Sequence, residues 1–553
     1  MFSTSLRRWF PLQANSVRNY ATRKKVPKFV RNQRLQFPSS KDKQYEYPKK
    51  TVSKGNSTKG NSTKGNSTKD PHTNPDSLPP YKFGSYAGLK LPDEEKRKGI
   101  QRLVSKITDF KELRINENVR NALIKELKNN TVLRSQNYIS STKKQKTDQE
   151  LNGLIIRPTP IQAAAIKIIG GKKALSDEFQ VFTLAAETGS GKTWAYLAPL
   201  LNNLYENRVA DRLEQQAEYG GDINRKKAGI QSIVLVPTHE LVDQVFQTLE
   251  NVAGDLNLKP YKWDTNSNFK DFIEHFRVGI DILVTTPGKL LSLTKYDSIS
   301  NPRMLLGSTR YCVVDEADTL MDSSWIEDTY GVARLMTALH HLVFVSATIP
   351  SEFNKTISKL FPKATAITTP SLHKLPKAIE FRVINASVAP YKGSKMKALA
   401  QALYAIHCDG TEMGYEKRVI VFVDNKLDCE KVAEKLQSKY NNDVRYISSE
   451  DSIEERKEKV REFVEPPKLL EDPSKPTLKV LVCTDLLSRG LNFTGIRNVI
   501  LLDVPKSSVD LVHRAGRTGR MNQSGRVFLI MNDQDKSHVR GLPKVIRNGR
   551  RLA

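Results

Sequence analysis

Residues 181–193, which read VFTLAAETGSGKT, predict the fold of the domain around them. An apolar, strand-like run ends at Ala185 and passes directly into a glycine-containing loop, and the helical pattern of residues 194–203 follows. Gly189 and Gly191 leave backbone amides at a helix start free to point at phosphate oxygens, and the helix dipole adds partial positive charge there. The stretch therefore predicts a phosphate-binding α/β domain.

The loop residues have candidate roles in nucleotide binding. Lys192 would reach the β and γ phosphates, and Thr193 would ligate Mg²⁺. A glycine-rich loop also occurs as an ordinary turn, so the prediction depends on its strand-to-helix context. The predicted cradle comprises Ala186, Glu187, Thr188, Gly189, Ser190, Gly191, Lys192 and Thr193.

A second motif, VVDEAD at residues 313–318, follows about 120 positions later. Adjacent carboxylates at the end of a buried strand lie where α/β sheets place their ligands. Asp315 would hold Mg²⁺, and Glu316 would orient and deprotonate an attacking water. In the alternative interpretation, these acids are a solvated N-terminal cap of the next helix.

Short β-branched runs alternate with helical patterns, which is typical of buried parallel strands joined by helices. We expect two similar domains, each a mostly parallel sheet covered by helices, in residues 96–370 and 378–540, with a linker at 371–377. Polar stretches at 133–153, 208–229 and 466–476 predict surface insertions. The predicted strands are residues 181–185, 232–237, 281–284, 311–314 and 342–345, then 418–423, 444–447, 479–483, 498–502 and 526–530.

The 553-residue chain has a formal net charge of +28, much of it at the start. Residues 1–69 hold 17 Lys and Arg against two acids, and the first 40 residues have no acid. We expect a mitochondrial transit peptide at 1–20, with an RNA-binding basic arm as the alternative. The Lys-Gly-Asn-Ser-Thr repeats of residues 54–68 predict a disordered basic arm at 21–95, and 541–553 is a predicted basic tail.

The cysteines and the hydropathy exclude several classes of protein. The four cysteines are far apart with no Cys-x-x-Cys pair, so neither a zinc knuckle nor a disulfide framework is indicated. No stretch approaches the ~20 apolar residues that a membrane span needs.

Residues 513–520, HRAGRTGR, place Arg517 and Arg520 three positions apart in the second domain. They could project from one helical face toward the first domain and act as arginine fingers on the γ phosphate. The alternative is a basic patch that touches nucleic acid.

The Asp-Glu-Ala-Asp box, Ser346-Ala347-Thr348 and the HRAGRTGR motif occur in an order that resembles the DEAD-box RNA helicases, from Phe110 to Val527. The chain resembles fungal mitochondrial members. The resemblance implies two RecA-like domains that close around ATP, Mg²⁺ and single-stranded RNA, and an RNA-dependent ATPase that yields ADP and phosphate.

The same resemblance assigns further roles. Gln162 would read adenine, and Phe110 is the candidate for stacking on it, because Gln145 occupies the family's usual aromatic position. Ser346 and Thr348 would couple hydrolysis to RNA by bridging Asp318 and His513. The implied RNA contacts are Pro237, Thr238, His239, Thr286, Pro287, Gly288, Lys289 and Thr484.

The chain departs from the family pattern mainly on the RNA side. His239 and Lys289 replace the usual Arg, a Gly-Gly doublet near Asn266 is absent, and Ile453 stands where Gln is common. Ser448-Ser449 replaces a common His-Gly, and Asn492 replaces an Asp. We expect altered RNA grip beside intact γ-phosphate chemistry.

The implied function is local unwinding or remodelling of RNA in the mitochondrial matrix, with ribosomal RNA in large-subunit assembly as the client. Ribosome-assembly proteins are implied partners of a monomer. One alternative is an ATP-gated RNA clamp or scaffold that separates no strands, and another is a P-loop NTPase that acts on DNA or protein.

Overall fold

The computed structural model describes residues 81, 83, 94–139, 155–171, 178–219, 228–296, 299, 301–369, 371–376, 378–412, 414–440, 442–447, 450–465, 467–472, 474–485, 493, 495–519, 524–535 and 537–552. The predicted transit peptide and nearly all of the predicted basic arm lie outside these residues. Within the described part, no helix is both long and apolar enough to cross a membrane.

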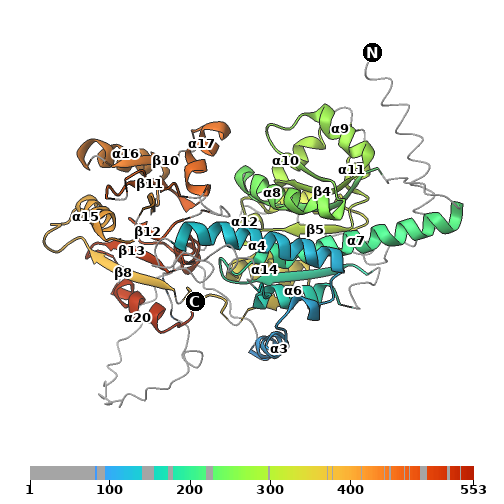
Figure 1. Ribbon diagram of the computed structural model, residues 1–553, viewed down its shortest axis with the longest axis horizontal. Coiled ribbons are helices and arrows are strands. Elements are labelled where there is room, and N and C mark those ends of the chain that lie inside the picture. Colours follow the sequence, from blue (N-terminus) through green and yellow to red (C-terminus); the bar gives the residue numbers. More distant parts are fainter. Residues whose placement is uncertain are drawn as a thin grey trace, which may run out of the picture. The chain divides into compact units, whose positions relative to one another are not determined.

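The first domain is built on a seven-stranded sheet in which every pairing is parallel (Figure 1). Its central strands are apolar and buried along most of their length, as expected for a sheet covered on both faces. In spatial order the strands are β3 (Pro260–Trp263), β4 (Ile280–Thr285), β2 (Ile230–Leu235), β5 (Tyr311–Val314), β6 (His341–Ser346), β1 (Gln180–Ala185) and β7 (Thr365–Thr368).

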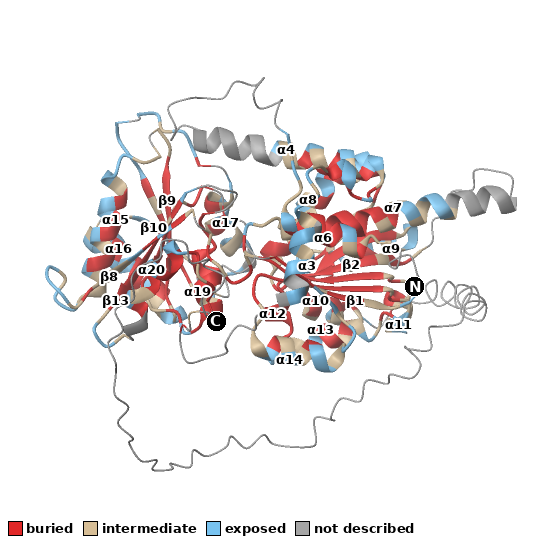
Figure 2. Cartoon of the chain, turned by 90° about the horizontal axis from the view of Figure 1, so that it is seen from below, coloured by how far each residue is buried: buried red, intermediate tan, exposed pale blue. Residues whose placement is uncertain are grey.

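Helices cover both faces of this sheet, with one apolar cluster under each group (Figure 2). The first cluster is formed with η2 (Phe110–Glu112), α4 (Glu117–Ile139), α6 (Pro160–Ile169), α7 (Lys192–Tyr219) and α8 (His239–Leu256), and α3 (Glu94–Val104) packs beside it. The second is formed with α9 (Phe269–Val278), α10 (Pro287–Leu293), α11 (Pro302–Leu306), α12 (Ala317–Leu320), α13 (Ile326–Ala333) and α14 (Ser351–Leu360).

The second domain repeats this design on a six-stranded parallel sheet. Its strands, in spatial order, are β10 (Asp443–Tyr446), β11 (Leu478–Cys483), β9 (Lys417–Phe422), β12 (Asn498–Leu501), β13 (Gly525–Met531) and β8 (Ile379–Asn385). One face packs against α15 (Lys395–Cys408) and α16 (Lys426–Tyr440). The other packs against α17 (Ile453–Val464), α19 (Ser508–Ala515), η4 (Ser537–Gly541) and α20 (Leu542–Arg547).

All ten predicted strands are present, and the two RecA-like α/β domains are confirmed. The sequence did not reveal β3, β7 or β8. These strands lie at sheet edges and are partly exposed, so they lack the continuous apolar run of a buried strand.

Two terminal segments differ from their sequence interpretation. Phe83, within the predicted arm, is buried in the second domain's core, and its carbonyl accepts a hydrogen bond from Ser508. Within the predicted basic tail, α20 buries Leu542, Val545 and Ile546 on the same core. Three apolar side chains at helical spacing are enough to dock a short helix.

The predicted insertions begin as extensions of regular structure. Helix α4 continues to Ile139 and α7 to Tyr219, into the first two of them. In the third, Leu469 forms a β-bridge with Tyr415, and Leu470 N–H donates to the Gly414 carbonyl at 2.8 Å. This insertion is therefore paired with the segment that leads into β9.

Candidate functional site

The phosphate cradle connects β1 to α7, as the sequence predicted. Gly189 (φ 77°) and Gly191 (φ 86°) adopt left-handed conformations that side chains other than glycine rarely tolerate. A Cβ atom at Gly191 would also lie 2.6 Å from the Gln162 amide nitrogen. The Lys192 ammonium donates to the carbonyls of Ala186 (3.1 Å) and Glu187 (3.2 Å), which places its charge over the loop.

Gln162 is buried against this cradle. Its Oε1 accepts from Thr159 N–H at 2.9 Å in the capping box of α6, and its Nε2 donates to the Gly191 carbonyl at 3.3 Å. The side chain thus ties α6 to the loop, and its adenine contact stays a prediction. Phe110 is 0% exposed within the first core, so the structure gives its ring a packing role, and stacking on adenine also stays a prediction.

The acidic pair lies at the carboxyl end of β5, in the middle of the sheet. Asp315 accepts from Tyr196 Oη at 3.1 Å and from Glu316 N–H at 2.8 Å. Burial and the neighbouring Glu316 carboxylate raise the pKa of Asp315 to about 7. Tyr196 was not predicted as a site residue, although it stands one helical turn after Thr193 on α7.

Glu316 has an unusual backbone and an unsatisfied side chain. It adopts a left-handed conformation (φ 47°, ψ 49°) and makes no side-chain capping bond to α12. The residue is buried, and within the described chain its Oε2 has no hydrogen-bond partner. Because a solvated cap would be exposed and would bond the helix amides, the capping interpretation does not describe Glu316.

Asp318 joins the two domains at this edge. Its Oδ2 accepts from Thr348 Oγ1 at 2.6 Å and lies 3.0 Å from His513 Nε2 of α19. Thr348 N–H in turn donates to Ser346 Oγ at 3.1 Å. The four predicted coupling residues therefore form one buried, connected group.

The second-domain motif also approaches the cradle. Gly516 leaves no room for a side chain beside Thr188, because an added Cβ would overlap the Thr188 hydroxyl. Arg517 is buried, and its Nε donates to the His513 carbonyl at 3.1 Å. Arg520 lies outside the described residues.

Arg514, which the sequence did not single out, donates to Asp485 at 2.7 Å and to Asp424 at 2.7 Å, and so fixes the position of α19.

The donor set suits a hard divalent cation. Glu316, Asp318 and His513 each offer a ligand atom within 4.8 Å of the others. Burial and Glu316 raise the pKa of Asp315 although the Lys192 charge opposes them, and the buried Glu316 Oε2 has no hydrogen-bond partner among the described residues. Carboxylate oxygens are the ligands that Mg²⁺ prefers, so the carboxylates of Asp315, Glu316 and Asp318 fit it.

Two family models match the chain in the order of its domains. The DEAD/DEAH box helicase model matches residues 159–356, and the helicase conserved C-terminal domain model matches residues 394–522. The ATP-dependent RNA helicase MRH4, mitochondrial, of Saccharomyces cerevisiae (strain ATCC 204508 / S288c) is 42% identical over 509 residues, covering 86% of this chain and 88% of that protein. Its Debaryomyces hansenii counterpart is 42% identical over 534 residues, covering 85% and 88%.

The chain belongs to the DEAD-box family of ATP-dependent RNA helicases. The predicted enzyme class, an RNA-dependent ATPase, and the mitochondrial localisation are confirmed by these relatives. Among solved structures, Mss116p (NTE and C-tail double deletion) bound to ssRNA and AMP-PNP is similar with a TM-score of 0.57. The matched region covers 78% of this chain and 75% of that one. At 18% identity the similarity shows the fold alone.

The predicted RNA track of this DEAD-box protein starts at the ends of adjacent strands β2 and β4. Thr238 caps α8 by accepting from Leu241 N–H, and Thr286 caps α10 by accepting from Lys289 N–H, both at 3.3 Å. Pro237 and His239 flank the first cap, and Pro287 and Gly288 follow the second. Thr484 comes directly after β11 in the second domain.

The two residues that replace the family's arginines have distinct surroundings. Lys289 Nζ lies 5.4 Å above the Trp263 ring, whose indole N–H donates to the Lys289 carbonyl at 3.2 Å. Burial lowers the pKa of His239, which therefore favours its neutral form near pH 7. Within the described residues its Nδ1 has no hydrogen-bond partner.

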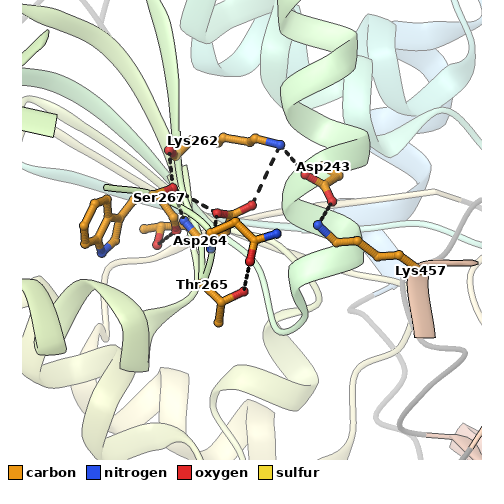
Figure 3. A network of polar contacts seen from close by, with 9 residues as sticks. Asp243, Lys262, Asp264, Thr265, Ser267 and Lys457 are labelled. Atoms are coloured by element: carbon orange, nitrogen blue, oxygen red, sulfur yellow. Dashed lines mark hydrogen bonds and ion pairs between the residues drawn. The ribbon is translucent and has the colours of Figure 1, made fainter. Parts of the chain in front are cut away.

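A charged network connects α8, β3 and α17 (Figure 3). Asp243 of α8 accepts from Lys262 of β3 at 2.7 Å and pairs with Lys457 of α17 at 2.7 Å. Although burial opposes it, hydrogen bonds from both lysines lower the pKa of Asp243. Arg456 pairs with Glu240 at 3.7 Å. These contacts join the domains, and the sequence did not reveal them.

The Asp264–Ser267 turn occupies the region where the glycine doublet was expected. Asp264 Oδ1 accepts from Asn266 N–H at 3.0 Å and from Ser267 Oγ at 2.9 Å, and the Asp264 side chain is buried (Figure 3). An acidic turn with hydrogen bonds inside the turn thus stands where the family has the glycine doublet.

Proposed function

We propose that this helicase remodels short structured segments of mitochondrial ribosomal RNA during large-subunit assembly. We propose an ATPase cycle in which the second domain completes the ATP site of the first domain only when RNA is bound. The contact of His513 with Asp318, which also accepts from Thr348, carries the proposed coupling of the domains, while the ribosomal client rests on the resemblance to fungal mitochondrial members. It connects the acidic box with both the second domain and the Ser-Ala-Thr motif.

Glu316 is proposed as the general base. Its buried oxygen without a partner is an acceptor that a substrate water could satisfy. Its backbone is left-handed and its side chain makes no capping bond to α12, so the carboxylate is not used to cap the helix. Orientation and deprotonation of the water by such a group typically contribute about 10²- to 10⁴-fold to the rate.

Thr193 and Asp315 would hold Mg²⁺. When bound, the ion would neutralise charge on the β and γ phosphates. Tyr196 fixes the Asp315 carboxylate by donating to its Oδ2, so that residue keeps one orientation.

Lys192 and the second-domain arginines are proposed to stabilise charge that develops on the γ phosphate. Lys192 already lies over the cradle carbonyls and reaches toward phosphate from there. Arg517 and Arg520 would act as arginine fingers, a role worth roughly 10³- to 10⁵-fold in related reactions. Arg517 is held one helical turn from His513, so both residues would respond to the same movement of α19.

RNA contacts are proposed to go to the sugar-phosphate backbone. The helix starts at α8 and α10 offer amides and hydroxyls that bind phosphates without reading bases. Sequence selectivity would then be low, and the 2′-hydroxyls would distinguish RNA from DNA. Competition between RNA and DNA of the same sequence tests this, and equal binding would contradict it.

An ATP-gated clamp without strand separation is the second candidate. It is favoured by the burial that keeps His239 neutral and by the ion pairs of Lys457 and Arg456 that join the domains. An RNA-stimulated ATPase assay beside a displacement assay on a short duplex decides between them. Remodelling predicts both activities, whereas the clamp predicts stimulated hydrolysis and long RNA residence with no displaced strand.

The ribosomal client is tested by crosslinking the protein to RNA in intact mitochondria and sequencing the fragments. We expect enrichment of large-subunit ribosomal RNA, and the Glu316→Gln variant should increase it by trapping bound RNA. Enrichment of messenger RNA alone would overturn the ribosomal assignment and leave the helicase activity in place.

A further inference from the structure

The cradle and the interdomain linker leave the first sheet side by side. Strand β1 ends at Ala185 and runs into the cradle, while the adjacent strand β7 ends at Thr368 and runs into the linker. Thr369 N–H donates to the Ala185 carbonyl at 3.2 Å, which extends the strand pairing by one bond. Any displacement of the linker start therefore acts next to the phosphate-binding loop.

Glu187 joins these two segments through its side chain. Its Oε2 accepts from Thr369 Oγ1 at 2.8 Å, and its Oε1 accepts from Ser371 Oγ at 2.7 Å. The two carboxylate oxygens are thus bound to hydroxyls just before the linker (Thr369) and at its start (Ser371), 182 and 184 positions away in the sequence. Hydrogen bonds to an ionised acceptor are shorter and stronger than neutral ones.

The Glu187 main chain holds the groups that face phosphate. Its carbonyl accepts from the Lys192 ammonium at 3.2 Å and from Ser190 Oγ at 2.7 Å. Glu187 therefore contacts the start of the linker through its carboxylate and Lys192 through its main-chain carbonyl.

The far end of the linker belongs to the second domain. Leu375 is buried in the second domain's core. His373 accepts from Ile349 N–H, just after the Ser-Ala-Thr motif, at 3.2 Å, and its carbonyl accepts from Leu552 N–H at 3.0 Å. The segment from Thr369 to Leu375 is thus anchored at the cradle, at the coupling motif and at the chain's last described residue.

We infer that Glu187 is a positioning residue that couples the interdomain linker to the phosphate cradle, so that RNA-driven domain closure sets the placement of Lys192. The inference rests on the proposed RNA-gated ATPase cycle and goes beyond it by naming the route. Glu187 acts through Lys192 and the loop, while the linker hydroxyls act through Glu187.

The test removes the hydroxyls from the linker side, which is outside the catalytic machinery. The double variant Thr369→Val/Ser371→Ala keeps side-chain volume close to the original and removes both donors. With poly(U) RNA we expect the stimulated kcat to fall about tenfold, since two bonds to a charged acceptor are lost. ATP turnover without RNA should stay within about twofold of wild type.

Two further variants separate coupling from folding. Thr369→Ser/Ser371→Thr keeps both hydroxyls and should restore RNA stimulation, and Thr365→Val, an exposed position on β7, is the matched control. Two outcomes for Thr369→Val/Ser371→Ala would overturn the inference: an equal fall of the ATPase rates with and without RNA, or unchanged RNA stimulation. If wild type itself shows no RNA stimulation, the proposed function fails instead.

Glu187→Gln gives an independent readout from the other side of the contact. The amide keeps one acceptor oxygen for one hydroxyl, so we expect RNA stimulation between that of wild type and that of Glu187→Ala. Combined with the linker double variant, Glu187→Ala should add no further loss, because the same contact is already broken. Additive losses would show that the two sites act separately.

Discussion

The ATP edge, meaning the phosphate cradle with the acidic box and the Ser-Ala-Thr motif, and the proposed RNA track have different relations to the family pattern. At the ATP edge, the cradle, the acidic box and the Ser-Ala-Thr motif are present. Their side chains contact one another, as Asp318 does with Thr348 and His513. Along the track, His239 and Lys289 replace arginines, and ion pairs such as that of Asp243 with Lys457 stand beside them. We therefore propose that chemistry which needs fixed distances is kept, while a grip on the RNA backbone, which needs only positive charge, is redistributed.

The largest effect should come from Glu316→Gln at the ATP edge. The amide removes the proton acceptor without changing size, so we expect ATP turnover to fall by about 10²- to 10⁴-fold. ATP and RNA binding, measured by fluorescence anisotropy, should persist. Glu327→Gln, an exposed position on α13, is the control and should leave turnover unchanged. Undiminished hydrolysis in Glu316→Gln would remove the base assignment.

His513→Ala breaks the contact from the second domain to the acidic box. Loss of a hydrogen bond to a buried carboxylate should reduce RNA-stimulated turnover roughly 10- to 100-fold. ATP affinity should change little, because the first domain builds the cradle alone. The control His407→Ala lies on α15 of the same domain. If His513→Ala hydrolyses ATP as fast as wild type with RNA present, the coupling role is wrong.

The comparison also explains what the sequence could predict. The cradle and the acidic box are contiguous motifs at strand ends, so spacing alone located them, and buried strands such as β4 and β5 stood out as continuous apolar runs. Edge strands such as β8 alternate between buried and exposed residues and escaped notice.

Contacts between distant segments could not be predicted from the sequence. Tyr196 and Asp315 are 119 positions apart, and Glu187 lies 182 positions from Thr369, so no local pattern connects either pair. Burial could not be predicted either: the motif singled out Phe110 for adenine, a role that stays a prediction, while the structure places its ring in the first core.

Charge reversal tests whether the Asp243–Lys457 pair compensates for the altered track. Both side chains are about 30% exposed, so the pair should contribute at most about 1 kcal/mol, or roughly fivefold in RNA-dependent closure. Lys457→Asp should weaken RNA-stimulated ATPase by that factor, and Asp243→Lys/Lys457→Asp should recover part of it. Recovery stays partial because Lys262 would then face a lysine.

The effect of that pair should shrink in about 1 M salt, where the screening length falls to about 3 Å, and part of it should remain because the pair is partly buried. Lys459→Asp, on the same helix but paired with Asp451 inside the second domain, is the control and should not alter RNA stimulation. Equal losses in the Lys457 and Lys459 variants would show that general charge on α17, not the link between domains, is responsible.

The smallest effect should come from restoring the family's arginines on the track. Burial lowers the pKa of His239, so its neutral form predominates between pH 8 and about 7, and wild-type RNA affinity should not rise over that interval. His239→Arg adds one cation, which should tighten RNA binding a few fold and steepen the salt dependence of log K by about 0.7, the value for one phosphate of a single strand. Lys289→Arg keeps the charge above Trp263, so its salt slope should equal wild type. Tighter RNA binding by the wild type on acidification, or equal salt slopes for His239→Arg and Lys289→Arg, would mean that His239 already contributes charge to RNA binding. The ATP edge and the RNA track would then differ less than their sequences suggest.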